Sequence, residues 1–122
     1  GNVWRARCLR CGGREDLREK PADVRPPVCA ACGGQMRPDV VLFGEMLPER
    51  VWSSAAERAA ACALCCVVGT SASIDPAAGL PAAAAEAGAF LVEVNPEPTP
   101  LSELCDVVLR GPAGAILPLL DV

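Results

Sequence analysis

Residues 39–122 alternate apolar runs with alanine-rich stretches. The uninterrupted apolar run at 64–68 predicts a strand that is covered on both faces, because it does not alternate with polar residues. Further runs of β-forming residues at 40–43, 90–94 and 105–109 predict three more strands. Strands that alternate with helical segments are typical of βα units around a parallel sheet, so the pattern indicates an α/β fold.

Two helices are predicted between these strands. The first should begin close to Pro48, because proline is tolerated in a first helical turn and an acidic residue follows it. Asp75 followed by Pro76 is typical of an N-cap and the first residue of a second helix. Pro81 either kinks that helix or marks its true start, and Gly88 closes it. The apolar positions of the first helix recur at i, i+4 and would face the sheet: Val51, Ala55, Ala59 and Cys62.

The first part of the chain, residues 1–38, differs in pattern and in charge. It has few large apolar residues, and it is too small to close a hydrophobic core unaided. It contains eight Lys or Arg against four Asp or Glu, a net charge of +4. Residues 39–122 contain three Arg against eleven Asp or Glu, a net charge of −8. We therefore predict two domains, 1–38 and 39–122.

Composition excludes several classes of function. The 122 residues are 52% hydrophobic and 21% charged, which predicts a folded chain. The absence of histidine excludes a Ser-His-Asp triad, a Cys-His pair and a histidine-ligated metal within these residues. No apolar run is long enough to predict a transmembrane helix, no leader peptide is recognised, and we expect no membrane partner.

Two CxxC pairs in the first part predict a structural zinc site. Cys8 and Cys11 form one pair and Cys29 and Cys32 the other, with 17 residues between the pairs and Gly-Gly after each. Four thiolates in a tetrahedral array form the closed coordination of a structural zinc ion, with no open position for a catalytic water. The alternative is a pair of disulfides, and the spacing in a chain without a leader favours zinc.

The other cysteines are interpreted as small apolar residues. Cys62, Cys65 and Cys66 lie in a uniformly apolar stretch that runs into a strand, where neighbouring side chains face opposite sides. Cys105 stands alone at the start of the last predicted strand. We therefore expect buried free thiols here rather than metal ligands. Free thiols favour the cytoplasm as the location of the protein.

Three predicted strands end in residues that suit a nucleotide. Ligands of open parallel sheets bind beyond the carboxyl ends of the strands. A glycine at such a strand end allows the ligand to approach the backbone closely. Hydroxyl, amide and carboxylate groups at the same place can form hydrogen bonds to phosphate or ribose. The chain contains neither a G-x-G-x-x-G motif nor a Walker loop, so we place any phosphate cradle outside these residues. The three ends are Gly69-Thr70-Ser71, Asn95-Pro96-Glu97 and the Gly-Pro-Ala-Gly segment at 111–114.

Taken in order, these motifs resemble the C-terminal half of a sirtuin, a family of NAD-dependent protein lysine deacylases. The resemblance covers essentially the whole chain. It implies an α/β fold, the C-terminal half of a Rossmann-type parallel sheet with a small four-cysteine zinc-ribbon module. Residues 1–38 would form the zinc ribbon and residues 39–122 the C-terminal part of the NAD-binding domain. The matching segments are Gly1-Asn2-Val3, the two CxxC pairs, Arg37-Pro38-Asp39-Val40-Val41-Leu42-Phe43-Gly44-Glu45, Gly69-Thr70-Ser71, Pro76-Ala77-Ala78-Gly79-Leu80-Pro81 and Val94-Asn95-Pro96-Glu97.

The resemblance also implies roles for individual residues. Val41 and Phe43 would line the tunnel for the acylated lysine, and the Val41 carbonyl would accept a hydrogen bond from the lysine amide. The peptide backbone of the substrate would pair as an added strand with Gly44, Glu45, Ser73 and Ile74. NAD would be contacted by Gly69, Thr70, Ser71, Asn95, Pro96, Glu97 and Ala113, and zinc would be held by Cys8, Cys11, Cys29 and Cys32.

The family's catalytic histidine would lie just before Gly1, so the resemblance implies no catalytic residue within this chain. We therefore expect the isolated chain to bind zinc and to show no deacylase turnover. Two alternatives stay open: a stand-alone zinc-ribbon adaptor for protein or nucleic acid, and a pseudoenzyme that retains only the peptide groove. We expect no nucleic-acid partner, because only Trp4 offers a stacking surface among the arginines of 1–38, and a zinc ion with four thiolates reduces the local charge to about +2.

Overall fold

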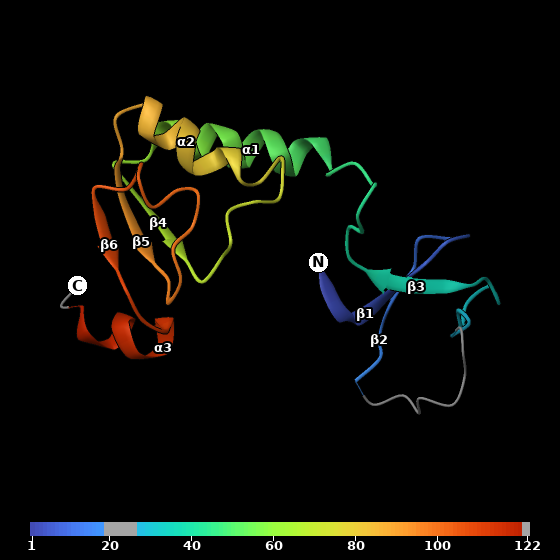
Figure 1. Ribbon diagram of the computed structural model, residues 1–122. Helices are drawn as coiled ribbons and strands as arrows, with labels where there is room; N and C mark the ends of the chain where they lie inside the picture. Colours follow the sequence, from blue (N-terminus) through green and yellow to red (C-terminus); the bar gives the residue numbers. More distant parts are fainter. Residues whose placement is uncertain (19–26, 121–122) are drawn as a thin grey trace. The chain divides into compact units, whose positions relative to one another are not determined.

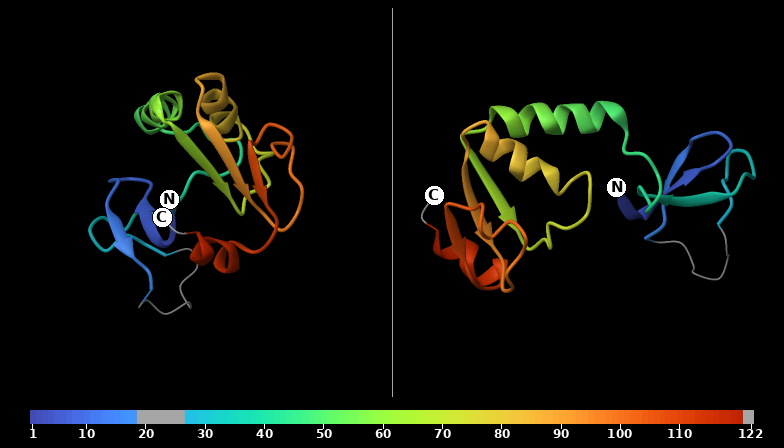
Figure 2. Two further views of the ribbon diagram at one scale, coloured as in Figure 1. Left: turned by 90° about the vertical axis from the view of Figure 1, so that its left-hand side faces the viewer. Right: turned by 45° about the horizontal axis from the view of Figure 1, so that its top comes forward.

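The computed structural model describes residues 1–18 and 27–120, and the chain divides into two compact units (Figure 1). Unit 1 comprises Gly1–Leu47 and unit 2 comprises Pro48–Val122. Each unit has its own sheet and its own buried cluster, as the two views of Figure 2 also show for the sheets.

Unit 1 is built on a three-stranded antiparallel sheet in the order β2-β1-β3. Its strands are β1 (Asn2–Cys8), β2 (Arg14–Asp16) and β3 (Met36–Asp39). One face of the sheet is buried, with Ala6, Cys8 and Met36 packed together with Cys29. Leu17 and Cys32 pack against this cluster, so the cysteines form a large part of what fills the core of the unit.

The prediction of a strand at 40–43 is wrong. After β3 the chain bends at Val40 and turns at Phe43 and Gly44 instead of continuing as a strand. The N–H of Glu45 donates to the carbonyl of Leu42 at 3.1 Å, which closes the turn. A run of β-forming residues becomes a strand only where another strand pairs with it, and β3 already uses the available edge of β1.

Unit 2 contains a three-stranded parallel sheet in the order β4-β5-β6, which confirms the α/β prediction. β4 (Leu64–Val68) and β5 (Phe90–Val94) match the predicted strands, whereas β6 (Val107–Leu109) is shorter than predicted. The chain before β6 is held by Asp106, whose N–H donates to the Leu91 carbonyl and whose Oδ2 accepts from the Leu91 N–H.

The first two helices of unit 2 pack on one face of this sheet. α1 (Glu49–Ala61) begins directly after Pro48, as predicted, and lies beside α2 (Gly79–Glu86) (Figures 1 and 2). Ala84, Ala89 and Leu91 form the buried cluster, and it is surrounded by partly buried Ala59, Cys62, Cys65, Ala85 and Cys105. Cys62, Cys65 and Cys105 thus pack as small apolar residues, as predicted.

Two predicted features of the helices are corrected. α2 begins at Gly79 rather than at Pro76, so Pro81 lies in its first turn and marks the true start. The C-terminal end of α2 is as predicted, because Gly88 adopts a φ of +91° and its N–H donates to the Ala85 carbonyl. Val51, at the N-terminal end of the predicted apolar stripe, is exposed, and no residue of α1 is fully buried.

The opposite face of the sheet is largely uncovered. Leu64 pairs in register with Phe90, and the two side chains are 55% and 48% exposed. Cys66 is also exposed, which corrects the prediction that it is buried. Its neighbours Cys65 and Val67 face the helices, and alternation along a strand places Cys66 on the other side.

A short helix, α3 (Ala113–Ile116), and a 3-10 turn (Leu117–Leu119) complete unit 2. Within residues 1–18 and 27–120, no helix is both long and apolar enough to cross a membrane.

Candidate functional site

The four cysteines of the CxxC pairs converge and form a candidate metal centre. Their sulfur atoms all lie within 4.8 Å of one another, with 3.5 Å between the sulfurs of Cys8 and Cys32 and 3.7 Å between those of Cys11 and Cys29. Tetrahedral coordination with Zn–S bonds of about 2.3 Å requires sulfur–sulfur distances of about 3.8 Å. A disulfide requires about 2.05 Å. All eight cysteines lie in the described part of the chain and are free, so the centre fits a zinc ion and not a pair of disulfides.

Each CxxC pair is carried by a turn that depends on glycine. The carbonyl of Cys8 accepts from the Gly12 N–H at 3.1 Å, and the carbonyl of Cys29 accepts from the Gly33 N–H at 2.8 Å. The two glycines have φ angles of +72° and +67°, a region that other residues rarely adopt. The Gly-Gly pairs of the sequence therefore shape two equivalent turns around the metal centre.

The second glycine of the second pair lies against the sulfurs themselves. A Cβ atom added to Gly34 would lie 3.0 Å from the Cys8 sulfur and 3.2 Å from the Cys32 sulfur. The N–H of Cys29 donates to the Gly34 carbonyl at 2.8 Å, which brings the two ends of the turn together. The lack of a side chain at Gly34 thus leaves room for the ligand sulfurs.

The backbone around the centre stabilises negative charge on sulfur. The Cys8 sulfur accepts from the N–H groups of Cys11 at 3.5 Å and Arg10 at 3.3 Å. These two donors lower the pKa of the Cys8 thiol to about 6. Although the Gly34 N–H acts in the opposite direction, the neighbouring Cys8 sulfur and burial raise the pKa of Cys32 to about 11. The two N–H donors therefore favour the thiolate form of Cys8, which is the form that binds a metal ion.

An ion pair shapes the loop that holds the predicted substrate residues of unit 1. The guanidinium of Arg37 donates through Nη1 and Nη2 to the two carboxylate oxygens of Glu45. The same carboxylate accepts from the Leu42 N–H at 3.0 Å. Arg37, and next the Leu42 N–H, lower the pKa of Glu45 to about 2. The closed loop leaves Val41 43% exposed and Phe43 90% exposed, so both are available to a ligand.

In unit 2, the loops after β4 and β5 are joined by one buried side chain. Asn95 is 8% exposed, and its Nδ2 donates to the Thr70 carbonyl at 2.8 Å. Its Oδ1 accepts from the Glu97 N–H at 3.2 Å, and the Gly69 N–H donates to the Val94 carbonyl at 2.9 Å. The predicted nucleotide residues at these two strand ends therefore lie together at one edge of the sheet.

The loop after β6 joins the same edge. The N–H of Asn95 donates to the Leu109 carbonyl at 3.2 Å, and the N–H of Gly111 donates to the Asn95 carbonyl at 3.3 Å. Ala113 follows as the first residue of α3 and is half-buried. Asn95 is thus the residue through which all three loops are connected.

The remaining predicted residues lie in the loop between β4 and α2. The Ser71 and Ser73 hydroxyls are 2.9 Å apart, and Ile74 is 54% exposed. The Thr70 hydroxyl accepts from the N–H of Ala72, which has a φ of +50°. This loop presents its polar groups and the Ile74 side chain outward.

A buried carboxylate that was not predicted from the sequence anchors the loop after β5. Glu93 is fully buried, and it accepts from the hydroxyls of Thr99 and Ser102 and from Nη1 of Arg110 at 3.0 Å. Arg110 also donates to the Glu97 carbonyl at 2.9 Å. Burial acts to raise the pKa of Glu93, but the two hydroxyls and the guanidinium outweigh it and lower the pKa. The sequence indicated this buried carboxylate only by placing one acidic residue, Glu93, in the otherwise apolar run at 90–94.

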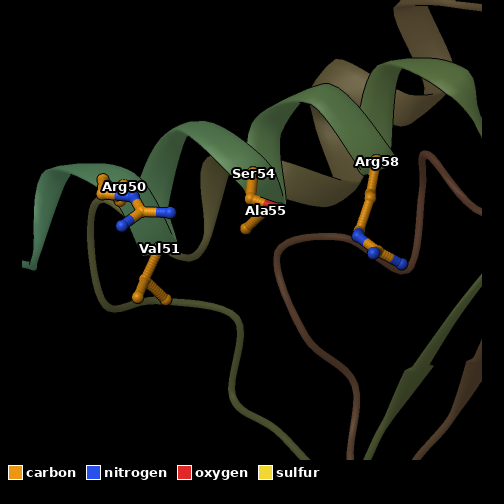
Figure 3. Close-up of a pocket in the computed structure, with 5 residues that line it drawn as sticks. All are labelled: Arg50, Val51, Ser54, Ala55 and Arg58. Carbon is orange, nitrogen blue, oxygen red and sulfur yellow. The ribbon is translucent and has the colours of Figure 1, made fainter.

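A hollow of about 630 Å³ lies along α1, outside these loops (Figure 3). Its lining residues all come from one helix and lie along one side of it, so they form an open surface rather than an enclosed site. We assign no function to this hollow, whose lining residues are Arg50, Val51, Ser54, Ala55 and Arg58.

Comparisons with known proteins agree with this arrangement. The sequence model of the Sir2 family matches residues 1–76. An NAD-dependent protein deacylase 2 of Pyrobaculum aerophilum is 48% identical over 120 residues, which are 98% of this chain and 48% of that protein. An NAD-dependent protein deacylase of Thermus thermophilus is 54% identical over 110 residues, which are 90% of this chain and 42% of that protein. The chain spans about half the length of the curated relatives it matches.

Solved structures of Sir2 proteins are also similar to this chain. A Sir2 homolog in complex with NAD superimposes with a TM-score of 0.88 at 38% identity, and the match covers 96% of this chain and 46% of that chain. A Sir2 complex with a p53 peptide and NAD+ superimposes with a TM-score of 0.83 at 31% identity, covering 91% of this chain and 48% of that chain.

Proposed function

This chain belongs to the Sir2 family, and from that premise we propose that it forms the zinc-ribbon and C-terminal nucleotide-binding part of an NAD-dependent protein lysine deacylase. Residues 1–38 would be the zinc-ribbon module and residues 39–122 the C-terminal part of the Rossmann-type domain. The free cysteines support a reducing compartment, and we propose the cytoplasm.

The observation that carries the proposal is the junction of three strand-end loops at Asn95. Hydrogen bonds of Asn95 join the loop after β4 to the loops on both sides of β6. A ligand of an open parallel sheet binds at this carboxyl edge. A Sir2 homolog of the same fold is described in complex with NAD, which supports a nucleotide at the corresponding edge of this chain.

We assign the adenosine side of NAD to these loops. Glu97 is exposed, and its carboxylate has no hydrogen-bond partner among the described residues, so it can accept from ribose hydroxyls. The backbone near Ala113 offers a surface to the adenine. Gly69 has a φ of +62° and no side chain, which lets phosphate or ribose approach the backbone. The proposed NAD-contacting residues are Gly69, Thr70, Ser71, Asn95, Pro96, Glu97 and Ala113.

We assign the acyl-lysine peptide to the exposed loops after β3 and β4. Val41 and Phe43 would contact the acylated lysine, because they expose apolar side chains on a loop that Arg37 holds closed. The peptide backbone would pair with Gly44, Glu45, Ser73 and Ile74 as an added strand. A Sir2 structure described with an acetylated peptide bound supports this substrate class.

Zinc would be held by the four thiolates of Cys8, Cys11, Cys29 and Cys32, and it would supply structural stabilisation only, because protein ligands fill a tetrahedral site. In the proposed reaction, the acyl oxygen attacks the ribose carbon as nicotinamide leaves, and a base removes a proton from a ribose hydroxyl. The 122 residues contain no histidine to act as that base. We therefore propose that this chain by itself binds ligands without turnover.

The proposal is tested by titrating ADP-ribose into the zinc-loaded chain while recording amide chemical shifts. We expect shifts at Gly69, Glu97 and Ala113. In Asn95→Ala we expect loss of the shifts at Gly69 and Glu97, because removing the side-chain amide breaks its bonds to the Thr70 carbonyl and the Glu97 N–H, while the backbone bonds to Leu109 and Gly111 remain. Glu103→Gln, a change at an exposed position, serves as the control. Shifts confined to α1, or no saturable shifts in the parent chain, would contradict the proposal. Deacylation of an acetyl-lysine peptide by this chain alone would contradict the predicted lack of turnover.

A further inference from the structure

One face of the sheet in unit 1 is covered by arginine side chains. Alternation along β1 places Arg5 and Arg7 on the face opposite to buried Ala6 and Cys8. The register adds residues from both neighbouring strands to this face, because Arg7 pairs with Arg14 of β2 and with Arg37 of β3. We call this surface the arginine face; its members are Arg5, Arg7, Arg14 and Arg37.

Three of these arginines converge on one carboxylate. Asp39 accepts from Nε of Arg5 at 2.8 Å and from Nε of Arg14 at 2.9 Å, and Nε of Arg7 lies 3.9 Å from its other oxygen. Asp39 is 14% exposed, whereas the three arginine side chains are 46–59% exposed. The carboxylate is thus enclosed while the guanidinium groups extend from it into solvent.

The arginine face continues into the loop that we assign to the substrate. Arg37 binds both oxygens of Glu45, and the positive charge of Arg7 also acts on Glu45. Glu45 and its neighbour Gly44 are the residues of unit 1 proposed to pair with the substrate backbone. An acyl-lysine peptide bound there would therefore extend beside the arginine face.

The charge of this face is not balanced within the described residues. Asp16 lies opposite Arg5 on the same face and pairs with Arg18, so five arginines face three carboxylates, those of Asp16, Asp39 and Glu45, which leaves a net charge of +2. Arg5 and Arg14 use Nε for Asp39, and their terminal amino groups make no further hydrogen bond within residues 1–18 and 27–120. A guanidinium group whose Nε is already bonded still has its terminal amino groups available, and these can bind a carboxylate with hydrogen bonds to both oxygens.

We infer that the arginine face binds acidic residues that flank the acylated lysine of the substrate, so that this chain favours acidic peptide segments. The inference rests on the proposed function for the location of the peptide, and on the arginines of unit 1 for its chemistry. An acidic peptide fits better than a nucleic acid, because Trp4 projects from the opposite face of β1 and the arginine face offers no aromatic side chain for base stacking.

Binding of charged probes to the zinc-loaded chain tests the inference. The probes are a labelled hexaglutamate peptide, a hexaserine peptide and a single-stranded hexanucleotide, measured by fluorescence anisotropy over a series of salt concentrations. We expect hexaglutamate to bind and hexaserine not to bind, with an affinity that falls as salt rises. Arg5→Gln combined with Arg14→Gln should weaken binding about tenfold, the loss expected for two partly exposed charge contacts.

Two further variants sharpen the test. Asp39→Asn should strengthen binding of hexaglutamate, because it removes the carboxylate that competes for the guanidinium groups. Arg50→Gln combined with Arg58→Gln removes the same charge from α1 in unit 2 and should leave the affinity unchanged. Zinc content, measured for every variant, shows whether unit 1 has kept its fold.

The outcomes separate this inference from the proposed function. The inference would be overturned if the α1 control variant lost as much affinity for hexaglutamate as the Arg5→Gln, Arg14→Gln variant. It would also be overturned if hexaglutamate and hexaserine bound the parent chain with equal affinity. Tighter binding of the oligonucleotide than of hexaglutamate would overturn the choice of an acidic peptide. The ADP-ribose shifts at Gly69, Glu97 and Ala113 do not depend on these arginines, so their absence would count against the proposed function alone.

Discussion

Glu93 contributes to the site without facing a ligand. It lies two residues before Asn95 on β5, and its carboxylate holds Thr99, Ser102 and Arg110. A buried charge is stabilising only when its hydrogen-bond partners are complete, and here three side chains complete them. Because Arg110 also donates a hydrogen bond to the Glu97 carbonyl, these contacts of Glu93 and Arg110 fix the backbone that follows Asn95.

We predict that Glu93→Gln lowers the free energy of unfolding of unit 2 by about 2 kcal/mol near neutral pH, because the amide cannot accept all three charge-assisted bonds. The pKa of Glu93 is lowered in the folded state, so its stabilisation is complete above the unfolded value of about 4.3 and is lost as the pH falls through the folded value. The difference between the parent and the variant should therefore narrow below about pH 4.

Hydrogen exchange of the amides of β5 measures this difference across the pH range. Glu103→Gln, in the same segment but exposed, should change exchange little at any pH. A stability difference that stays constant between neutral and acidic pH would show that the effect of Glu93 is steric rather than electrostatic.

At the scale of elements, β4 is an edge strand of the sheet in unit 2. Within the described residues it pairs only with β5, so its other edge presents unpaired backbone groups. Leu64 and Val68 add exposed apolar side chains on the open face of the sheet. An edge of this kind is a template for pairing with another chain.

We predict that the chain associates with itself as its concentration rises. Leu64→Lys combined with Val68→Lys should shift the equilibrium toward the monomer without unfolding unit 2, because both side chains already contact solvent. Sedimentation velocity measures the change, and Val51→Lys on exposed α1 provides a matched control. A parent chain that stays monomeric at its highest attainable concentration would rule out the association.

At the scale of the whole molecule, the two units should respond differently to metal removal. The buried cluster of unit 1 contains four residues, of which Cys8 and Cys29 are proposed zinc ligands. A core this small cannot offset the entropy of folding, and binding of a structural zinc ion supplies about 10 to 16 kcal/mol. The buried cluster of unit 2 contains no residue of the metal centre.

We therefore predict that a chelator unfolds unit 1 and leaves unit 2 folded. Residue-resolved hydrogen exchange should show loss of protection at β1 and β3 and unchanged protection at β5, and added zinc should restore the parent pattern. Loss of protection at β5 to the same extent would mean that the two units fold as one cooperative body.

The sequence by itself determined those features that depend on neighbours along the chain. The CxxC motif in addition identifies its own chemistry, so the sequence predicted a shared four-sulfur site although 17 residues separate the two pairs, and the distances between the four sulfurs confirm it. The apolar runs at β4 and β5 and the glycine that ends α2 were likewise found where local pattern placed them. The assignment of individual residues to NAD and to the substrate stays a prediction.

Only the tertiary structure decided the features that depend on distant partners. The run at 40–43 has the composition of a strand, yet it bends, because Arg37 and Glu45 close the loop and no strand of the described residues pairs with it. The role of Glu93 depends on Arg110, which lies 17 residues further along the chain. Local pattern carries no information about such contacts, since the fold alone brings those side chains together.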